Sequence, residues 1–467
     1  MSFMATILPD LNQKENIYSE TTRFFKQAKL GVFLHRSNIH KVKGVSALSI
    51  IRFVFSLVLH GMSFSRALKS DRIPKDFRKD VVYDLLKNPT YNWRKLLVLV
   101  STYLIEKFIR PLTSERRDCV LIFDDSAFYR NRSKCVELLA RAKDHAHHVY
   151  FKGFRMLTLG WSDGATFLPL AFSHLSSPKA KNRFQEMDSS IDKRTVGYKR
   201  RKEAIQKTTE TMFNLLNAVD PEKLGAKAVL FDSWFAFPST IAKIVRNYSL
   251  DVVCMLKDLP RVSYHYEGQS YRLSQLYKMV RKKRGRAKIL ASIVVGLGHN
   301  DEYGQEIQAR IVFVRDRNRS KKWLALLTTN MNHTDEDVVR IYGKRWDIEC
   351  FFKVTKSYLK LGKEFQCQSY DSMFAHTTIV FLRYLMLSLR AREEEDPRTL
   401  GQLFYMYCEE IDDIQFAEAL LTIIEALGQT LAESFLLTDE KIQDFLDCFI
   451  NKLPSFLQKP LLKSEAA

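Results

Sequence analysis

The chain has 467 residues, enough for two to four folded units and a substantial core. Hydrophobic residues make up 46% of it and aromatic residues 12%, which excludes a disordered or low-complexity protein. Lys and Arg number 73 against 53 Asp and Glu, so the formal net charge is +20. This excess attracts polyanions, which makes nucleic acid the first class of partner to consider, although ribosome-associated and membrane-surface proteins share such a balance.

The seven cysteines are scattered and never spaced as C-x-x-C, which argues against a disulfide framework or a zinc ribbon. The first 20 residues carry acidic side chains and lack the apolar stretch of a signal peptide. The most apolar windows, residues 48–62 and 377–389, each contain an arginine and are too short to span a bilayer. We therefore expect a cytoplasmic protein without a membrane partner.

Three regions follow one another along the chain. Residues 1–115 combine apolar residues at helical spacing with many Lys and Arg, which predicts a helical basic region. This region is either a bundle with a charged outer face or a DNA-binding domain. Residues 116–370 alternate strand-like and helical patterns, and residues 371–467 return to helical periodicity with amphipathic stretches at 400–427 and 431–449 that suit dimerisation.

The middle region predicts an α/β unit with a mixed sheet. Short apolar runs predict strands, and a turn of Ser, Asp, Gly and Ala at 162–165 joins the second and third of them; the runs are 120–123, 154–161, 166–172, 228–231 and 251–256. A polar, basic stretch at about 181–218 predicts a helix between them. Residues 260–330 break this rhythm and predict an inserted, mostly β subdomain with strands at 264–273, 289–296, 306–314 and 323–329.

Two of the predicted strands end in aspartate. Asp124 and Asp125 follow residues 120–123, and Asp232 follows residues 228–231. A carboxylate at the end of a buried strand is held by the sheet and faces solvent, and two such groups on neighbouring strands repel each other unless a cation lies between them. Mg²⁺ takes oxygen ligands of this kind. A turn or a helix cap is the alternative interpretation of each aspartate alone.

A third carboxylate follows the β-rich residues. Thr334 and Asp337 resemble a capping box, which predicts that a helix begins there. On a helix that advances roughly 100° per residue, one stripe about 60° wide contains Tyr342, Arg345, Glu349 and Lys356. Such a stripe could present a metal-binding carboxylate flanked by phosphate-binding cations, or it could be an ordinary solvated face.

This stripe resembles a known family. Tyr342, two residues, Arg345, three residues, Glu349, six residues and Lys356 reproduce the Y-R-E-K signature of the IS-four-like insertion-sequence transposases, which are DDE recombinases with an RNase H-like fold. Residues 123–126 are similar to the first-aspartate motif, where Ser or Thr follows the aspartate; this favours Asp125 as the ligand and leaves Asp124 as the alternative. Residues 229–235 are similar to the second-aspartate motif and point to Asp232. The resemblance covers about residues 115–390.

The resemblance implies an α/β fold: an RNase H-like catalytic core with a mixed sheet, interrupted by a β-rich insertion at about 260–330 and flanked by helical N- and C-terminal regions. It implies a catalytic triad of Asp125, Asp232 and Glu349 that holds two Mg²⁺ ions, with Mn²⁺ as a substitute. By the same resemblance, Tyr342, Arg345 and Lys356 contact DNA phosphates. Trp323 would stack on a flipped base, although a core tryptophan in a strand is the alternative, and Trp346 is expected to pack beside the site.

The implied activity is metal-dependent cut-and-paste cleavage at transposon ends and strand transfer into target DNA. The partners are double-stranded DNA, as terminal inverted repeats and as target, and a second copy of the chain in the synaptic complex, in the bacterial cytoplasm at the nucleoid. A metal-dependent nuclease without strand transfer and an inactive transposase-derived DNA-binding protein are the alternatives. Three basic clusters, at 199–202, 281–286 and 315–322, suggest a surface that contacts DNA phosphates, although each alone fits a solvated face.

Overall fold

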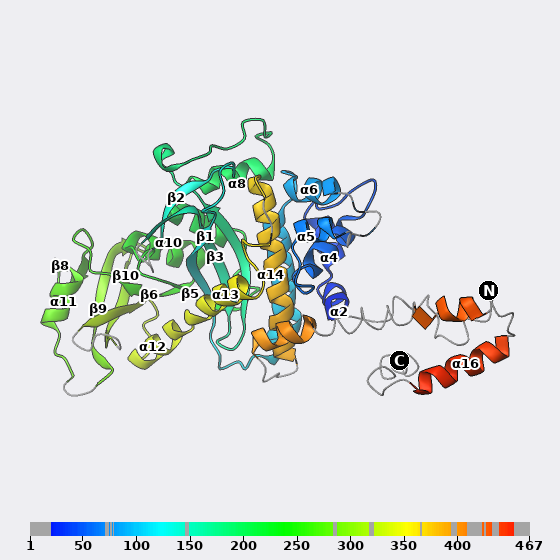
Figure 1. Ribbon diagram of the computed structural model, residues 1–467. Helices are drawn as coiled ribbons and strands as arrows, with labels where there is room; N and C mark the ends of the chain where they lie inside the picture. The colour runs from blue at the N-terminus through cyan, green and yellow to red at the C-terminus, as the bar shows by residue number, and fades with distance from the viewer. Residues whose placement is uncertain are drawn as a thin grey trace.

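A large mixed sheet with helices packed against it forms the body of the protein, and a group of N-terminal helices lies beside it (Figure 1). The computed structural model describes residues 20–452, apart from 71–73, 75–76, 78, 145–148, 284–286, 317–321, 365–366, 394–398, 409–422, 425 and 432–438. One hydrophobic core cluster includes side chains of the N-terminal helices, the sheet and the long helix α14 (Tyr370–Glu393). The expected α/β class with a mixed sheet is confirmed.

The N-terminal region is helical, as its apolar periodicity predicts. Side chains cap three of its helices: Ser46 accepts from Ser49 N at 3.1 Å, Ser63 from Arg66 N at 3.2 Å, and Asn92 from Lys95 N at 3.0 Å. Such caps satisfy backbone donors that have no partner within the helix. The helices are α2 (Glu20–Gln27), α3 (Leu30–Arg36), α4 (Ala47–Ser56), α5 (Phe64–Lys69), α6 (Lys79–Lys87) and α7 (Trp93–Leu104), followed by the short π-helix Ile105–Ile109 and the short 3₁₀-helix Arg110–Leu112.

Five strands form the part of the sheet that carries the aspartates. They lie in the order β4-β3-β1-β5-β6; β3 is antiparallel to β1 and β4, whereas β5 and β6 run parallel to β1. A further strand, β2, pairs with β3 and was not predicted. Their bounds are β1 (Cys119–Tyr129), β2 (Ala140–Asp144), β3 (Val149–Ser162), β4 (Phe167–Leu175), β5 (Ala226–Phe231) and β6 (Asp251–Leu256).

The helices between these strands are shorter than the sequence suggests. The predicted helical stretch at 181–218 is wrong over residues 183–195, which form turns and loops after the short turn Ala180–Asn182. The helices that do form there are α8 (Val196–Ala204) and α9 (Thr208–Leu216), and α10 (Pro238–Tyr248) connects β5 to β6.

The β-rich insertion extends the same sheet. Its last strand, β11, pairs antiparallel with β6, and β10, β9, β7 and β8 continue outward from it. The insertion is therefore hydrogen-bonded to the core sheet and is not a detached subdomain. It also contains one helix that was not predicted. Its elements are β7 (Tyr264–Tyr266), β8 (Gln269–Tyr271), α11 (Leu273–Met279), β9 (Ile289–Asn300), β10 (Glu306–Arg315) and β11 (Trp323–Thr328).

Two helices, and not one, follow the insertion. α12 (Asp335–Gly343) ends after Gly343, and α13 (Trp346–Ser357) begins after Arg345. The junction is a tighter turn, in which Lys344 N donates to Ile341 O at 3.0 Å and Arg345 N donates to Tyr342 O at 3.0 Å. The expectation of one continuous helix from 334 to 356 is therefore wrong. The predicted capping box is present, since Thr334 Oγ1 accepts from Asp337 N at 3.1 Å.

The long helix α14 (Tyr370–Glu393) lies between the sheet and the N-terminal helices, as Figure 1 shows. By length and composition it could cross a membrane, but the whole of its most apolar window is buried inside the protein. α14 is thus a core helix. Farther along, Ile424 packs with Ile442 and Leu446 of α16 (Asp439–Lys452) in a small separate cluster.

Candidate active site

The two aspartate motifs meet at one edge of the sheet. The parallel pairing of β1 with β5 ends at Ile122 and Leu230, whereas β1 continues to Tyr129 in its pairing with β3. The prediction that the first strand ends at the aspartates is therefore wrong. β1 continues past them, and only the neighbouring strand β5 ends at this level. Asp124 and Asp232 each lie two residues beyond the last pair. Since side chains in register on parallel strands point to the same face, these two carboxylates are neighbours on one face of the sheet.

Arg345 connects this face to the glutamate helix. Its Nη1 donates to Asp124 Oδ2 at 2.9 Å, and its Nη2 donates to Glu349 Oε1. The side chain of Asp124 is 16% exposed and that of Glu349 is 34% exposed, so the group lies close to solvent. Asp124, Asp232 and Glu349 are called the three carboxylates below.

Asp125 lies on the opposite face. Successive residues of a strand alternate between faces, and Asp125 accepts a hydrogen bond from Arg155 Nε of β3. The structure therefore places Asp124, and not Asp125, on the face shared with Asp232, whereas the sequence motif favours Asp125. The motif signal is the hydroxyl residue Ser126 directly after Asp125, and this signal does not depend on which face of β1 each aspartate occupies.

Lys356 contacts the same face of the sheet two residues beyond Asp124 in β1. Its Nζ donates to Ser126 Oγ at 2.6 Å, and Ser126 alternates onto the Asp124 side of the strand. Burial lowers the pKa of Lys356, and the charge of Asp144 opposes that shift. Three members of the predicted stripe, Arg345, Glu349 and Lys356, thus lie along β1 despite the break between α12 and α13.

The electrostatics of the group call for a cation. Burial raises the pKa of Asp124 to about 7; Arg345 lowers it, while the charges of Asp125 and Asp232 raise it. Burial alone would lower the pKa of Arg345, but Tyr342 and the three carboxylates outweigh that effect and raise it. Burial also raises the pKa of the Tyr342 hydroxyl, and Arg345 opposes this shift. The guanidinium of Arg345 therefore neutralises carboxylates that repel one another.

The donor chemistry of the three carboxylates fits a hard divalent cation. Carboxylate oxygens are the ligands of Mg²⁺ and Mn²⁺, and a bound cation relieves the repulsion between neighbouring carboxylates. Within the part of the chain that the structure describes, no three His, Cys, Asp or Glu side chains are close enough together to hold a metal as they stand. Arg345 lies between Asp124 and Glu349, where a cation shared by them would lie.

Trp323 and Trp346 lie in different surroundings. Trp323 begins β11, and its ring stacks on Tyr277 at 4.5 Å and contacts Phe313 edge-on at 5.3 Å between ring centroids. It is partly buried in the aromatic core of the insertion, as its alternative interpretation states. Trp346 was expected to pack beside the site but is 63% exposed.

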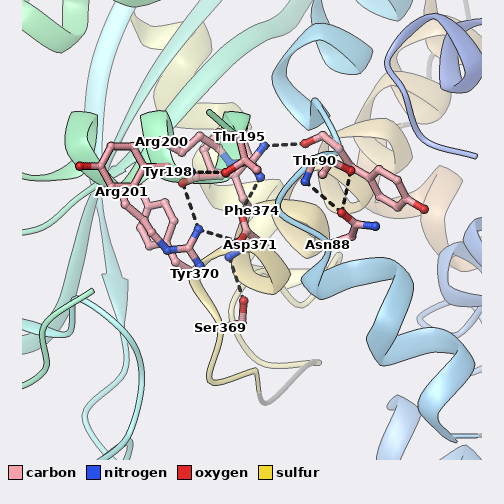
Figure 2. A network of polar contacts seen from close by, with 12 residues as sticks. Asn88, Thr90, Thr195, Tyr198, Arg200, Arg201, Ser369, Tyr370, Asp371 and Phe374 are labelled. Carbon is pink, nitrogen blue, oxygen red and sulfur yellow. Dashed lines mark hydrogen bonds and ion pairs between the residues drawn. The ribbon is translucent and has the colours of Figure 1, made fainter. Parts of the chain in front are cut away.

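The basic cluster at 199–202 is not a DNA-contacting surface as a whole. Arg200 and Arg201 are buried, 4% and 1% exposed, and both bind the carboxylate of Asp371 in α14 (Figure 2). Arg201 also donates to Glu137 Oε2 at 2.7 Å. These two arginines thus hold α8 to α14. The other two clusters lie partly outside the described residues, at 284–286 and 317–321.

Comparison with protein families agrees with the fold. The model of the DDE superfamily endonucleases matches residues 76–271, which include Asp124 and Asp232. The model of the transposase DDE domain matches residues 207–386, which include Asp232 and Glu349. No curated protein matches the chain in sequence. Together the two matches span residues 76–386 and indicate a transposase or endonuclease of the DDE superfamily, a class that cleaves nucleic acid. The mixed sheet is consistent with an RNase H-like DDE domain.

Proposed function

We propose that this protein is a DNA transposase of the IS-four-like group, which cuts at the terminal inverted repeats of a transposon and joins the released ends to target DNA. The observation that carries the proposal is the shared face of Asp124, Asp232 and Glu349, with Arg345 and Lys356 beside them. The match to the transposase DDE domain, which spans the signature Tyr342 to Lys356, supports the same assignment.

Asp124, Asp232 and Glu349 would hold the divalent cations, two Mg²⁺ ions with Mn²⁺ as a substitute. When bound, such ions stabilise the charge that develops on the attacking and leaving oxygens of a displacement at phosphorus. Arg345 would leave its place between Asp124 and Glu349 and turn to the DNA backbone. A guanidinium suits that task because it binds phosphate oxygens in a bidentate manner.

Tyr342, Arg345 and Lys356 would position the strand to be cut. Phosphate contacts fix the register of the DNA without reading its sequence, so these residues would serve every step of the reaction alike. The N-terminal helices with their basic side chains are proposed to bind the transposon end. Synapsis of two ends requires two copies of the chain, and the helices after residue 400 would supply the dimer contact. Such a protein would act in the cytoplasm at the nucleoid.

The function is tested with the DNA that flanks the reading frame. Duplexes that carry inverted repeats from this flank are incubated with the protein, target plasmid and Mg²⁺, and the products are resolved on denaturing gels. We expect nicking at the repeat ends and covalent products of repeat and plasmid. Nicking without joined product would favour a nuclease, and the absence of nicking at any repeat would contradict the proposal.

Metal binding should depend on pH through Asp124. Its pKa of about 7 means that a proton competes with the metal at lower pH, because the protonated carboxyl is a poor ligand. The apparent Mn²⁺ affinity should be constant above about pH 8 and should fall by up to about tenfold per unit below about pH 7. Electron paramagnetic resonance of free Mn²⁺ measures this, and an affinity that is unchanged between these pH values would contradict the role of Asp124.

Replacement of Lys356 should weaken DNA binding through one phosphate contact. We expect Lys356→Met to lower the affinity for transposon-end DNA and to reduce the slope of log affinity against log salt by about 0.9. Lys353→Met on the exposed face of the same helix is the matched control, and it should leave the slope unchanged. Fluorescence anisotropy over a salt series gives both quantities. Equal slopes for Lys356→Met and the wild type would remove Lys356 from the DNA contact.

A further inference from the structure

The guanidinium of Arg345 bridges two of the three carboxylates. Its Nη1 donates to Asp124 Oδ2 at 2.9 Å, and its Nη2 donates to Glu349 Oε1. Asp124 belongs to β1 and Glu349 to α13, so one side chain connects the sheet to the glutamate helix. Only 16% of the Arg345 side chain is exposed, so water screens these contacts only in part. Arg345 thus satisfies carboxylate oxygens that would otherwise be open to a metal ion.

A divalent cation and Arg345 compete for these oxygens. An ion bound to Asp124 and Glu349 would lie next to a guanidinium of the same sign, and like charges a few ångströms apart repel each other strongly away from bulk water. Arg345 cannot lose its charge to avoid this repulsion, because a guanidinium stays protonated in proteins. A metal ion must therefore displace the Arg345 side chain from its two partners.

The anionic groups that stabilise Arg345 are the candidate metal ligands themselves. Burial alone would lower the pKa of Arg345, and the effects of Tyr342 and the three carboxylates outweigh it. If a metal ion takes the carboxylates, a mostly buried guanidinium loses its compensating charges, which makes the displacement unfavourable. A phosphate of bound DNA supplies new negative charge, because its oxygens accept two parallel hydrogen bonds from a guanidinium.

We propose that Arg345 keeps the metal site closed until DNA binds. Without DNA it competes with the metal at Asp124 and Glu349, and a DNA phosphate that takes over the guanidinium frees both carboxylates for Mg²⁺. This inference deepens the proposed function and rests on it. DNA and metal then bind cooperatively, and by thermodynamic linkage each raises the affinity of the other by the same factor.

Such control suits a chain with a formal net charge of +20, which attracts DNA of any sequence. Contacts between DNA and other basic side chains leave Arg345 in its place between the carboxylates. The protein then holds little metal and cuts little DNA. The cleaving centre is assembled only where a phosphate reaches Arg345.

Metal binding by the DNA-free protein tests the competition directly. Mn²⁺ is titrated into the wild type and into Arg345→Met at about pH 8, and free Mn²⁺ is followed by electron paramagnetic resonance. We expect Arg345→Met to bind Mn²⁺ about 5- to 150-fold more tightly than the wild type, because its carboxylates hold no competing cation. Arg345→Gln, which is neutral but can still donate to one carboxylate, should lie between the two. Affinities of both variants equal to or below that of the wild type would overturn the proposal.

Arg340→Met controls for the change of net charge. Arg340 of α12 pairs with Asp337 at 2.9 Å and with Asp118 at 3.2 Å, and its side chain is 53% exposed. Its loss removes one positive charge without freeing any of the three carboxylates, so the Mn²⁺ affinity should equal that of the wild type. An increase as large as in Arg345→Met would identify a long-range effect of charge and would remove Arg345 from the competition.

The reciprocal measurement uses DNA. The affinity for a transposon-end duplex is measured by fluorescence anisotropy with and without Ca²⁺, at one ionic strength. A phosphate that binds the ion directly contributes in every variant, so the difference between variants carries the test. Ca²⁺ should raise the affinity of the wild type and of Arg340→Met by a larger factor than that of Arg345→Met. Equal factors in the wild type and Arg345→Met would contradict the proposed coupling.

The outcomes separate this inference from the proposed function. If the wild type nicks and joins transposon ends but DNA-free Arg345→Met binds Mn²⁺ no more tightly than the wild type, the competition is wrong and the transposase stands. If the wild type never nicks DNA, the proposed function is wrong. Tighter Mn²⁺ binding by Arg345→Met would even then support the competition, because that measurement needs neither DNA nor catalysis.

Discussion

Replacement of Asp124 by Asn should abolish Mg²⁺-dependent nicking of DNA, whereas Asp125→Asn should retain most of it. Asp124 lies on the face shared with Asp232 and Arg345, and Asp125 lies on the other face, paired with Arg155. The metal ions stabilise the charge of the transition state by several kcal/mol, and loss of one of their ligands removes much of this stabilisation. The rate of nicking should therefore be at least about 10³-fold lower. Asp125→Asn only weakens an ion pair at the edge of the site, so a loss within about tenfold is expected.

Initial nicking rates of the two variants, measured at saturating Mg²⁺ on one transposon-end duplex, provide the comparison. Each variant should still bind this duplex, which shows that the fold is intact. Asp232→Asn and Glu349→Gln should behave like Asp124→Asn. The reverse ranking, with Asp125→Asn inactive and Asp124→Asn active, would contradict the assignment of the first carboxylate.

Replacement of Asp371 by Asn should produce the largest loss of stability. Its carboxylate is fully buried and accepts from Arg200 Nη2 and from Arg201 Nη1, the latter at 2.6 Å (Figure 2). Asn is similar in shape but neutral, so Arg200 loses the negative charge that balances its own in the core and keeps neutral contacts, among them the carbonyl of Tyr91 at 2.8 Å and the ring of Phe374. Breaking a buried pair in this way costs about 3–5 kcal/mol.

Urea unfolding followed by circular dichroism measures the effect as a lower free energy of unfolding. Asp192→Asn is the matched control, because Asp192 pairs with Arg194 on the exposed surface at 2.8 Å and its loss should not shift the unfolding curve. If Asp371→Asn were as stable as the wild type, the buried network would not hold α8 to α14.

Much of the local structure could be predicted from the sequence. The apolar run at 251–256 has the bounds of β6, and the Ser-Asp-Gly-Ala turn joins β3 to β4, because strand length and turn chemistry are local properties. The capping box at Thr334 is equally local. The order of the strands that were predicted then agrees with an RNase H-like domain, although β2, α11 and the break between α12 and α13 were not predicted.

The choice between Asp124 and Asp125 could not be predicted in the same way. It depends on the register of β1 against β5, which is a contact between segments about a hundred residues apart, and a shift by one residue reverses the face of every side chain. The ion pair between Arg201 and Asp371 could not be predicted for the same reason, because the two residues are 170 positions apart in the sequence. The basic run at 199–202 was therefore interpreted as a surface that contacts DNA. The stacking of Trp323 on Tyr277 could not be predicted either, because Tyr277 lies on another element of the fold.

Iron-directed cleavage of the polypeptide tests the central claim most directly. Fe²⁺ replaces Mg²⁺ in the complex with transposon-end DNA, and ascorbate with peroxide then generates radicals that cut the chain near the bound ion. Fragments that end close to Asp124, Asp232 and Glu349, suppressed by excess Mg²⁺ and absent in Asp232→Asn, are the expected result. Cleavage confined to other segments, or unchanged in Asp232→Asn, would show that these side chains do not share a metal site.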